Sequence, residues 1–200
     1  MKKLLFVKSV ITGEDSQSAK LASAIIERIK KKEDGNIRIV EKDLVHNPPA
    51  HLGPKHLKAF SARREDLDEE HLALLDWSDK AVDELFETDY VVVTAPMYNL
   101  AIPSNLKTWI DNLNRAGKTF KYSEAGAEGL IKDKKVYVAI STGGVYSEAP
   151  LKELDHTESY LKAMFNFLGM TDVKTFRLEG AAIPGIKETA LEKAISSIKL

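Results

Sequence analysis

The chain of 200 residues contains no cysteine. Disulfide bonds, thiolate zinc ligands and a cysteine nucleophile are therefore excluded. Phosphatases that share a loop-to-helix phosphate site need a cysteine nucleophile, so this class of enzyme is excluded as well. An excess of charge of one sign is also lacking, because 29 lysines and arginines nearly balance 30 aspartates and glutamates. Such a balance gives no broad electrostatic footprint for nucleic acid or an anionic membrane. We therefore expect small-molecule partners, with neither nucleic acid nor a membrane among them.

Long hydrophobic runs are absent from the start of the sequence. The apolar residues 4–7 are followed by Lys8, a run too short for a signal-peptide core or a membrane-spanning helix. We therefore expect a cytoplasmic protein. The hydrophobic share of 44% and the charged share of 30% are those of an ordinary globular protein, and the length suits one domain of residues 1–200.

Short apolar runs alternate with helical patterns along the chain. The apolar runs predict strands at residues 4–7, 37–40, 89–94, 135–141 and 173–178. Apolar residues three or four apart predict helices at residues 16–32, 69–88, 103–115, 153–168 and 186–198. Because parallel strands need crossovers, the alternation predicts an α/β fold. We expect a three-layer, flavodoxin-like, five-stranded parallel sheet of order 2-1-3-4-5 with helices on both faces.

Two segments interrupt this alternation, at about residues 44–68 and 118–134. Both are interpreted as insertions at the edge of the sheet. His46, His51 and His56 recur in the first insertion, but no His-Glu-x-x-His pattern accompanies them. We therefore expect a solvated, proline-rich loop there and no metal site.

The loop after the first strand, residues 9–18, is a candidate phosphate site. In an open α/β sheet the ligand crevice lies beyond the carboxyl ends of the strands, where the strand order reverses. This first loop carries Ser9, Ser16 and Ser18 and leads into free amides at a helix N-terminus. It has neither a Walker lysine nor Gly-x-Gly-x-x-Gly, so one terminal phosphate suits it better than a triphosphate or a pyrophosphate. Serines that only cap and turn explain the loop alone equally well.

Two further loops are expected at the same crevice. The second loop, residues 95–100, is apolar and aromatic, which suits a flat ligand, although burial beneath an insertion would explain it as well. The third loop, residues 141–147, contains a Gly-Gly pair whose amides can approach a ligand. At the pyrimidine edge of a flavin, such amides would stabilise the negative charge of the reduced ring. Taken together, the three loops favour a functional crevice.

Four stretches of the sequence carry a resemblance to a known family. They are Lys8–Ser9 with Ser16–Ser18, Ala95–Asn99, Arg115–Tyr122 through Glu128–Leu130, and Ser141–Gly144. In these stretches, and over its whole length, the chain resembles the FMN-dependent NADH-azoreductases of the flavodoxin-like superfamily, which also reduce quinones. The resemblance implies an oxidoreductase that binds FMN, takes electrons from NADH or NADPH, and reduces azo compounds and quinones by ping-pong hydride transfer through flavin N5. It implies no catalytic side chain, because the flavin carries the chemistry.

The resemblance also implies the residues of the cofactor site. The first loop would hold the FMN phosphate and ribityl chain, the second would line the isoalloxazine ring, and the third would meet its pyrimidine side. The implied cofactor-binding residues are Ser9, Ser16, Gln17, Ser18, Pro96, Met97, Tyr98, Asn99, Leu100, Ser141, Thr142, Gly143, Gly144 and Tyr146.

Members of the resembled family are homodimers with the flavin near the subunit interface, so a homodimer is expected here. Phe120, Tyr122 and the first insertion would then face a flavin across the dimer, on the substrate side. Some relatives carry arginine in place of Thr142 and histidine in place of Tyr146. Substrate range and the choice between NADH and NADPH therefore stay open.

A flavodoxin-type electron carrier without its own small-molecule substrate is the alternative. Carriers are typically strongly acidic, which helps them dock redox partners. A near-zero net charge, the pair Arg63 and Arg64, and the aromatic second insertion favour an enzyme with its own pocket. A receiver domain is disfavoured because Lys8 and Ser9 stand where such a domain needs clustered acids.

Overall fold

The computed structural model describes residues 1–124 and 126–200, except for the side chain of Glu14. Its main feature is one parallel sheet of five strands in the order β2-β1-β3-β6-β7. The strands are β1 (Lys2–Lys8), β2 (Ile37–Asp43), β3 (Tyr90–Pro96), β6 (Lys135–Ser141) and β7 (Asp172–Leu178). Numbered along the chain, these strands follow the order 2-1-3-4-5. The predicted flavodoxin-like topology is thus confirmed.

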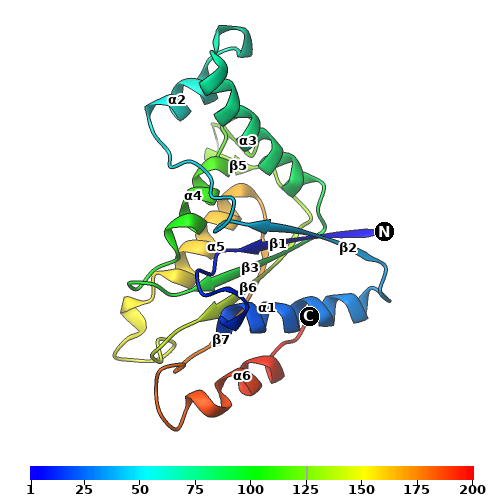
Figure 1. The fold of residues 1–200 in the computed structure, drawn as a ribbon. Helices are drawn as coiled ribbons and strands as arrows, with labels where there is room; N and C mark the ends of the chain where they lie inside the picture. The colour runs from blue at the N-terminus through cyan, green and yellow to red at the C-terminus, as the bar shows by residue number, and fades with distance from the viewer. Residues whose placement is uncertain (125) are drawn as a thin grey trace.

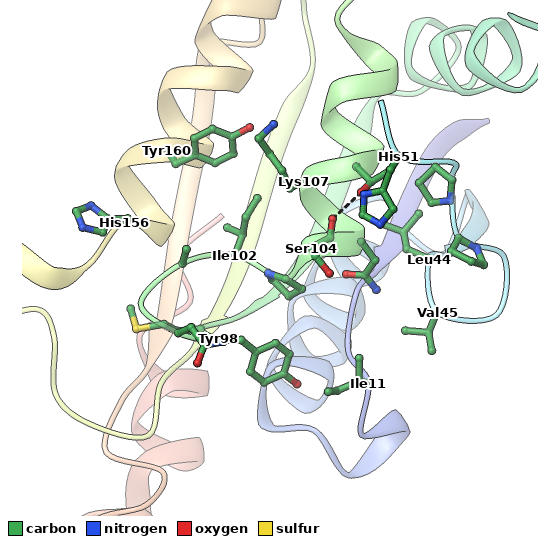
Figure 2. A pocket seen from close by; sticks show the side chains of 18 residues that line it. Ile11, Leu44, Val45, His51, Tyr98, Ile102, Ser104, Lys107, His156 and Tyr160 are labelled. Carbon is green, nitrogen blue, oxygen red and sulfur yellow. Dashed lines mark hydrogen bonds between the residues drawn. The ribbon is translucent and has the colours of Figure 1, made fainter. Parts of the chain in front are cut away.

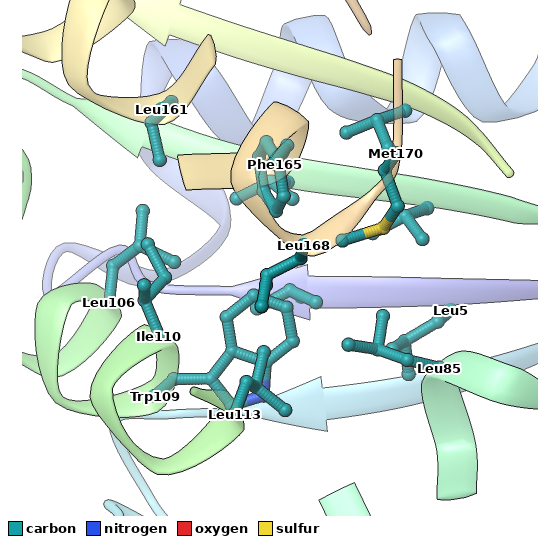
Figure 3. Close-up of a cluster of buried hydrophobic side chains, with 14 of the residues drawn as sticks. Leu5, Leu85, Leu106, Trp109, Ile110, Leu113, Leu161, Phe165, Leu168 and Met170 are labelled. Atoms are coloured by element: carbon teal, nitrogen blue, oxygen red, sulfur yellow. The ribbon is translucent and has the colours of Figure 1, made fainter. Parts of the chain in front are cut away.

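Helices cover both faces of the sheet (Figure 1). One face carries α1 (Gln17–Lys32) and α6 (Lys187–Ser196), and the other carries α3 (Glu69–Phe86), α4 (Ser104–Leu113) and α5 (Thr157–Leu168). Successive strand residues point to opposite faces, so the near-continuous apolar runs of β1, β3 and β6 supply both cores. Figure 3 shows the core under α3, α4 and α5, where Trp109 lies close to Leu113 and Leu168. No helix in the described part of the chain is long and apolar enough to cross a membrane.

Two element boundaries differ from the sequence-based prediction by three residues or more. Strand β2 continues to Asp43, beyond the predicted end at residue 40. Because β2 is an edge strand, it accommodates the charged Glu41, Lys42 and Asp43, none of which is buried. Helix α5 begins at Thr157 and not at residue 153, since the short helix η3 (Lys152–Leu154) precedes it and the Asp155 carboxylate accepts a hydrogen bond from the Thr157 amide at 2.8 Å.

The first insertion is more ordered than predicted. It follows the edge strand β2 and contains α2 (Pro54–Ser61) and η2 (Arg64–Asp66), with α2 packed against α3. The expectation of a solvated loop is wrong for His56, which is 3% exposed and whose Nδ1 accepts a hydrogen bond from the Gly53 amide at 3.2 Å. Burial lowers the pKa of this histidine. Pro54 at the first helical position is a start signal that the sequence carried.

The second insertion forms an antiparallel hairpin of β4 (Phe120–Ser123) and β5 (Gly126–Gly129). The expected position at the edge of the five-stranded sheet is wrong for this segment. The hairpin lies between α4 and the inner strand β6 in sequence, and β5 packs against α5 in the helical layer. There, Gly129 lies against Gly169 so closely that neither position has room for a Cβ.

Candidate functional site

Hydrogen bonds join the three predicted loops at the carboxyl ends of β1, β3 and β6. The amide of Ser9 donates to Thr94 Oγ1 at 2.8 Å, and Ser9 Oγ donates to the Thr94 carbonyl at 2.5 Å. These bonds tie the first loop to the end of β3. The Met97 amide donates to the Ser141 carbonyl at 2.8 Å, which ties the second loop to the third. The sheet topology thus brings the three loops to one rim, where open α/β sheets bind ligands.

The first loop ends at the N-terminus of α1, where the described atoms leave several backbone amides without an acceptor. A short helix, η1 (Gly13–Asp15), leads into Ser16, whose hydroxyl lies 3.0 Å from that of the buried Ser18. The first amide bonded within α1 is that of Lys20, which donates to the Ser16 carbonyl at 3.0 Å. Among the described atoms, the amides of residues 17–19 have no acceptor. Three free amides at the positive end of a helix dipole form a site for an anion such as a phosphate.

Ser9 and Asn105 fix the backbone of this loop through hydrogen bonds. Because the Ser9 hydroxyl donates its only hydrogen to Thr94, Ser9 fixes the path of the loop, and its contact with a phosphate stays a prediction. Asn105 Nδ2 donates to the Ser9 carbonyl at 3.2 Å from the first turn of α4. Sequence reasoning missed Asn105. Its place two residues after Pro103, at a helix start that faces the carboxyl end of β3, was the available signal.

The second loop contains a strained two-residue turn. Tyr98 and Ala101 exchange two backbone hydrogen bonds, at 2.9 and 3.1 Å. The residues between them, Asn99 and Leu100, have φ angles of 51° and 69°. Positive φ at both central positions defines a type I′ turn, which leucine rarely adopts. Such strain costs on the order of 1–3 kcal/mol per residue and is found mainly at functional sites.

A cavity of about 1140 Å³ opens beside this turn (Figure 2). Met97, Tyr98 and Asn99 form one wall, and the remaining walls come from other segments of the chain. These segments contribute Ile11 from the first loop, Val45 and His51 from the first insertion, and His156 and Tyr160 at the start of α5, while the first turns of α4 contribute Ser104, Asn105, Lys107 and Thr108. The position of this insertion at the crevice of its own chain was not expected from the sequence. The cavity offers a mainly apolar space with several ring-shaped side chains, which suits a flat aromatic ligand.

The third loop places glycine backbone beside an aromatic ring. Thr142 Oγ1 donates to the Gly144 carbonyl at 2.7 Å and so closes the turn. A Cβ at Gly144 would lie 3.1 Å from a ring carbon of Tyr146, so the ring and the backbone meet closely. Residues 141–146 do not line the cavity of Figure 2 but lie next to its Met97 wall through the bond between Met97 and Ser141.

Phe120 and Tyr122 lie apart from the crevice of their own chain. The Phe120 ring is 8% exposed and packs against Phe167, with ring centroids 4.8 Å apart. Tyr122 is 73% exposed on the hairpin. Neither residue lines the cavity, so their contact with a flavin across a dimer stays a prediction.

An ionic cluster stands behind the third loop. Arg177 on β7 forms ion pairs with Asp155 at 2.7 Å, Glu158 at 2.9 Å and Glu179 at 3.0 Å. Burial raises the pKa of Glu158 and Glu179, but hydrogen bonds and cations outweigh it. The net pKa of Glu158 is lowered by Lys162, Thr175 and Arg177, and that of Glu179 by the Ser147 hydroxyl, the Tyr146 amide and Arg177.

The lowered pKa of Glu158 predicts a loss of stability in acid. The carboxylate stabilises the folded state above its unfolded pKa of 4.5, and this contribution disappears as the pH falls through the lower folded value. We expect Glu158→Gln to reduce the free energy of unfolding by about 1–2 kcal/mol at pH 7 and by progressively less below pH 4.5. Urea unfolding at a series of pH values measures this difference.

The exposed Glu153 supplies the control for this prediction. Glu153→Gln should change the free energy of unfolding by less than about 0.5 kcal/mol at each pH. A deficit of Glu158→Gln that stays constant from pH 7 to pH 3.5 would contradict the titration of Glu158 as its cause.

The fold and the three loops together define a class: a flavodoxin-like α/β protein with an anion site at the N-terminus of α1 and an apolar crevice beside it. The family model described as the flavodoxin-like fold matches residues 2–199.

Comparison with known proteins narrows this class. An FMN-dependent NADH:quinone oxidoreductase of Francisella philomiragia is 38% identical over 200 residues, covering 100% of this chain and 98% of the relative. An azoreductase from Bacillus anthracis strain Sterne has a TM-score of 0.86 and 36% identity, covering 98% of both chains. An FMN-dependent NADH-azoreductase from Bacillus anthracis strain Ames Ancestor, solved in complex with FMN, has a TM-score of 0.88 and 27% identity, covering 98% of this chain and 95% of the other. The chain belongs to the azoreductase family within the flavodoxin-like fold.

Proposed function

We propose that this chain is an FMN-dependent oxidoreductase that uses NADH or NADPH to reduce quinones and azo compounds. The observation that carries the proposal is the meeting of two features at one rim of the sheet. One is three amides at the start of α1 that have no acceptor among the described atoms, and the other is an apolar crevice between the second loop and the first insertion. A phosphorylated, flat heterocycle matches both features. The names of full-length relatives, which include quinone oxidoreductases and azoreductases, support the same function over that of an electron carrier.

The residues present fit FMN. The amides of residues 17–19 would hold the phosphate, with the Ser16 and Ser18 hydroxyls beside them. Met97, Tyr98 and Asn99 would lie along the ring, and the amides of Gly143 and Gly144 would meet its pyrimidine edge. We propose that the other cofactor-binding residues implied by the resemblance, from Ser9 to Tyr146, also contact FMN.

A bound flavin supplies hydride acceptance and donation at N5, which is the redox chemistry that the side chains of this protein lack. The residues of the protein bind the flavin and orient it. The second loop presents a rigid face because its strained turn is closed by two backbone hydrogen bonds. Ile11, Val45 and Tyr160 line the cavity, whose volume of about 1140 Å³ can receive a nicotinamide and then an acceptor in turn.

We also propose that the protein acts as a cytoplasmic homodimer. The Tyr122 ring is 73% exposed on a hairpin that is anchored in the core through Phe120, a geometry suited to contact with a second subunit. In this arrangement, the partner subunit's flavin would meet Tyr122.

Flavin titration and stopped-flow absorbance test the proposed function. The protein is expected to quench the fluorescence of added FMN at a ratio of one per chain, and NADH or NADPH should bleach the bound flavin. A quinone should then restore the colour, with parallel lines in double-reciprocal plots of a ping-pong reaction. Binding of FMN without bleaching by either nucleotide would indicate an electron carrier. Absence of FMN binding would refute the proposal altogether.

A further inference from the structure

Three consecutive carbonyls in the third loop are held by one segment after β7. The Thr142 carbonyl accepts from the Ala181 amide at 3.0 Å, and the Gly143 carbonyl accepts from the Ala182 amide at 3.0 Å. The Gly144 carbonyl accepts from the Gly180 amide at 2.9 Å. Residues 180–182 therefore act as a template that fixes the orientation of three successive peptide groups.

This template determines where the amides of the third loop point. In a trans peptide, the carbonyl and the following N–H point in opposite directions, and the only cis bond in the described part of the chain is Ala149-Pro150. With three carbonyls turned toward residues 180–182, the amides of residues 143–145 point away from that segment. None of these three amides has an acceptor among the described residues. The loop thus offers a row of aligned donors to a ligand.

Glu179 holds the third loop in place through hydrogen bonds to the residues that follow the donor row. Its Oε1 accepts hydrogen bonds from the amides of Tyr146 and Ser147, both at 2.9 Å, and its Oε2 accepts one from Ser147 Oγ at 2.5 Å. Glu179 directly precedes residues 180–182, and the amides that it binds directly follow residues 143–145. One carboxylate therefore joins the two loop segments. Arg177 holds the same carboxylate at 3.0 Å, and the Glu179 side chain is only 16% exposed.

We propose that Glu179 is a positioning residue that sets the reduction potential of the bound flavin by aligning the amides of residues 143–145. This inference rests on the proposed function, because it takes the pyrimidine edge of FMN as the ligand of the donor row. Reduction places negative charge on that edge, so aligned donors stabilise reduced FMN more than oxidised FMN. Loss of the alignment lowers the potential, whereas loss of a nearby negative charge alone raises it. The sign of the change separates the two effects.

Glu179→Ala and Glu179→Gln form the matched pair for the test. Glutamine keeps an oxygen for the Tyr146 and Ser147 amides and an NH₂ that can donate to Ser147 Oγ, so it removes the charge and retains the hydrogen bonds. We expect Glu179→Ala to weaken the binding of reduced FMN about tenfold more than that of oxidised FMN. For this two-electron couple, a tenfold ratio lowers the potential by about 30 mV. Glu179→Gln retains the alignment and loses only the charge, so its potential should equal or exceed that of the wild type and should not fall.

The measurements are the midpoint potential, from equilibration with a reference dye, and the dissociation constant of oxidised FMN, from fluorescence quenching. An unchanged potential in Glu179→Ala, an equal shift in both variants, or a rise in potential in both would overturn the inference. Should Glu179→Ala fail to fold, Ser147→Ala removes one of the three bonds and should lower the potential by about 14 mV, a threefold ratio; no shift would then count against Glu179. Wild-type protein that binds no FMN would instead refute the proposed function.

Discussion

Glycine at position 129 is expected to be indispensable, and Gly129→Ala should lower the free energy of unfolding by about 3 kcal/mol or more. A Cβ there would lie 2.1 Å from the Gly169 amide nitrogen, 2.2 Å from the Leu168 carbonyl carbon and 2.5 Å from the Phe167 carbonyl oxygen. All three are backbone atoms at the end of α5, so no side-chain rotation relieves the overlap. The Ile131 amide, which donates to the Leu168 carbonyl at 2.9 Å, would be displaced with it.

Thermal and urea unfolding measure this effect. For a chain of this size, about 3 kcal/mol corresponds to a fall in Tm of roughly 6–12 °C. Gly53→Ala is the matched control, because its Cβ would meet only the His51 carbonyl oxygen, at 3.9 Å. As Gly53 precedes α2 as its N-cap, we expect a cost below about 1 kcal/mol. Equal stability of the Gly129→Ala protein and the wild type would show that the contact between the hairpin and α5 is not tight in solution.

The topology was predictable because it follows from local patterns. The apolar runs of β1, β3 and β6 are buried on both faces, and a parallel strand of that kind reads as a continuous hydrophobic stretch. Once the strand order is known, the carboxyl ends of these strands must share one rim, so the three loops could be placed there from sequence. The hydrogen bonds from Ser9 to Thr94 and from Met97 to Ser141 confirm this placement.

The features that the sequence did not reveal depend on contacts between distant residues. The contact of Gly129 with Gly169 joins two segments 40 residues apart, and the sequence of neither segment predicts this contact. The same holds for Glu179, whose carboxylate binds the amides of Tyr146 and Ser147. The wall that Val45 and His51 add to the cavity depends on how the first insertion folds back from the edge strand. The composition of residues 44–68 predicted an insertion, but it did not predict how that insertion folds against the rest of the chain.

Gln17→Glu is expected to weaken FMN binding about 100-fold while leaving the fold intact. Gln17 is the first residue of α1, and its amide is one of the three that have no acceptor among the described residues. A carboxylate roughly 6 Å from a phosphate costs about 3 kcal/mol per pair of unit charges at an effective dielectric constant of about 20. The same carboxylate interacts favourably with the helix dipole, by about 0.3–1 kcal/mol, so thermal stability should not fall.

Riboflavin, which lacks the phosphate, is the control ligand. Its affinity should be the same for wild type and Gln17→Glu, because only the phosphate meets the added charge. Gln17→Leu removes the side-chain amide without adding charge, and we expect it to weaken FMN binding less than tenfold, about the value of one hydrogen bond. Fluorescence quenching measures both ligands with all three proteins. Equal weakening of FMN and riboflavin by Gln17→Glu would place the phosphate elsewhere, since a charge at the start of α1 can discriminate between the two only if the phosphate is bound at that helix end.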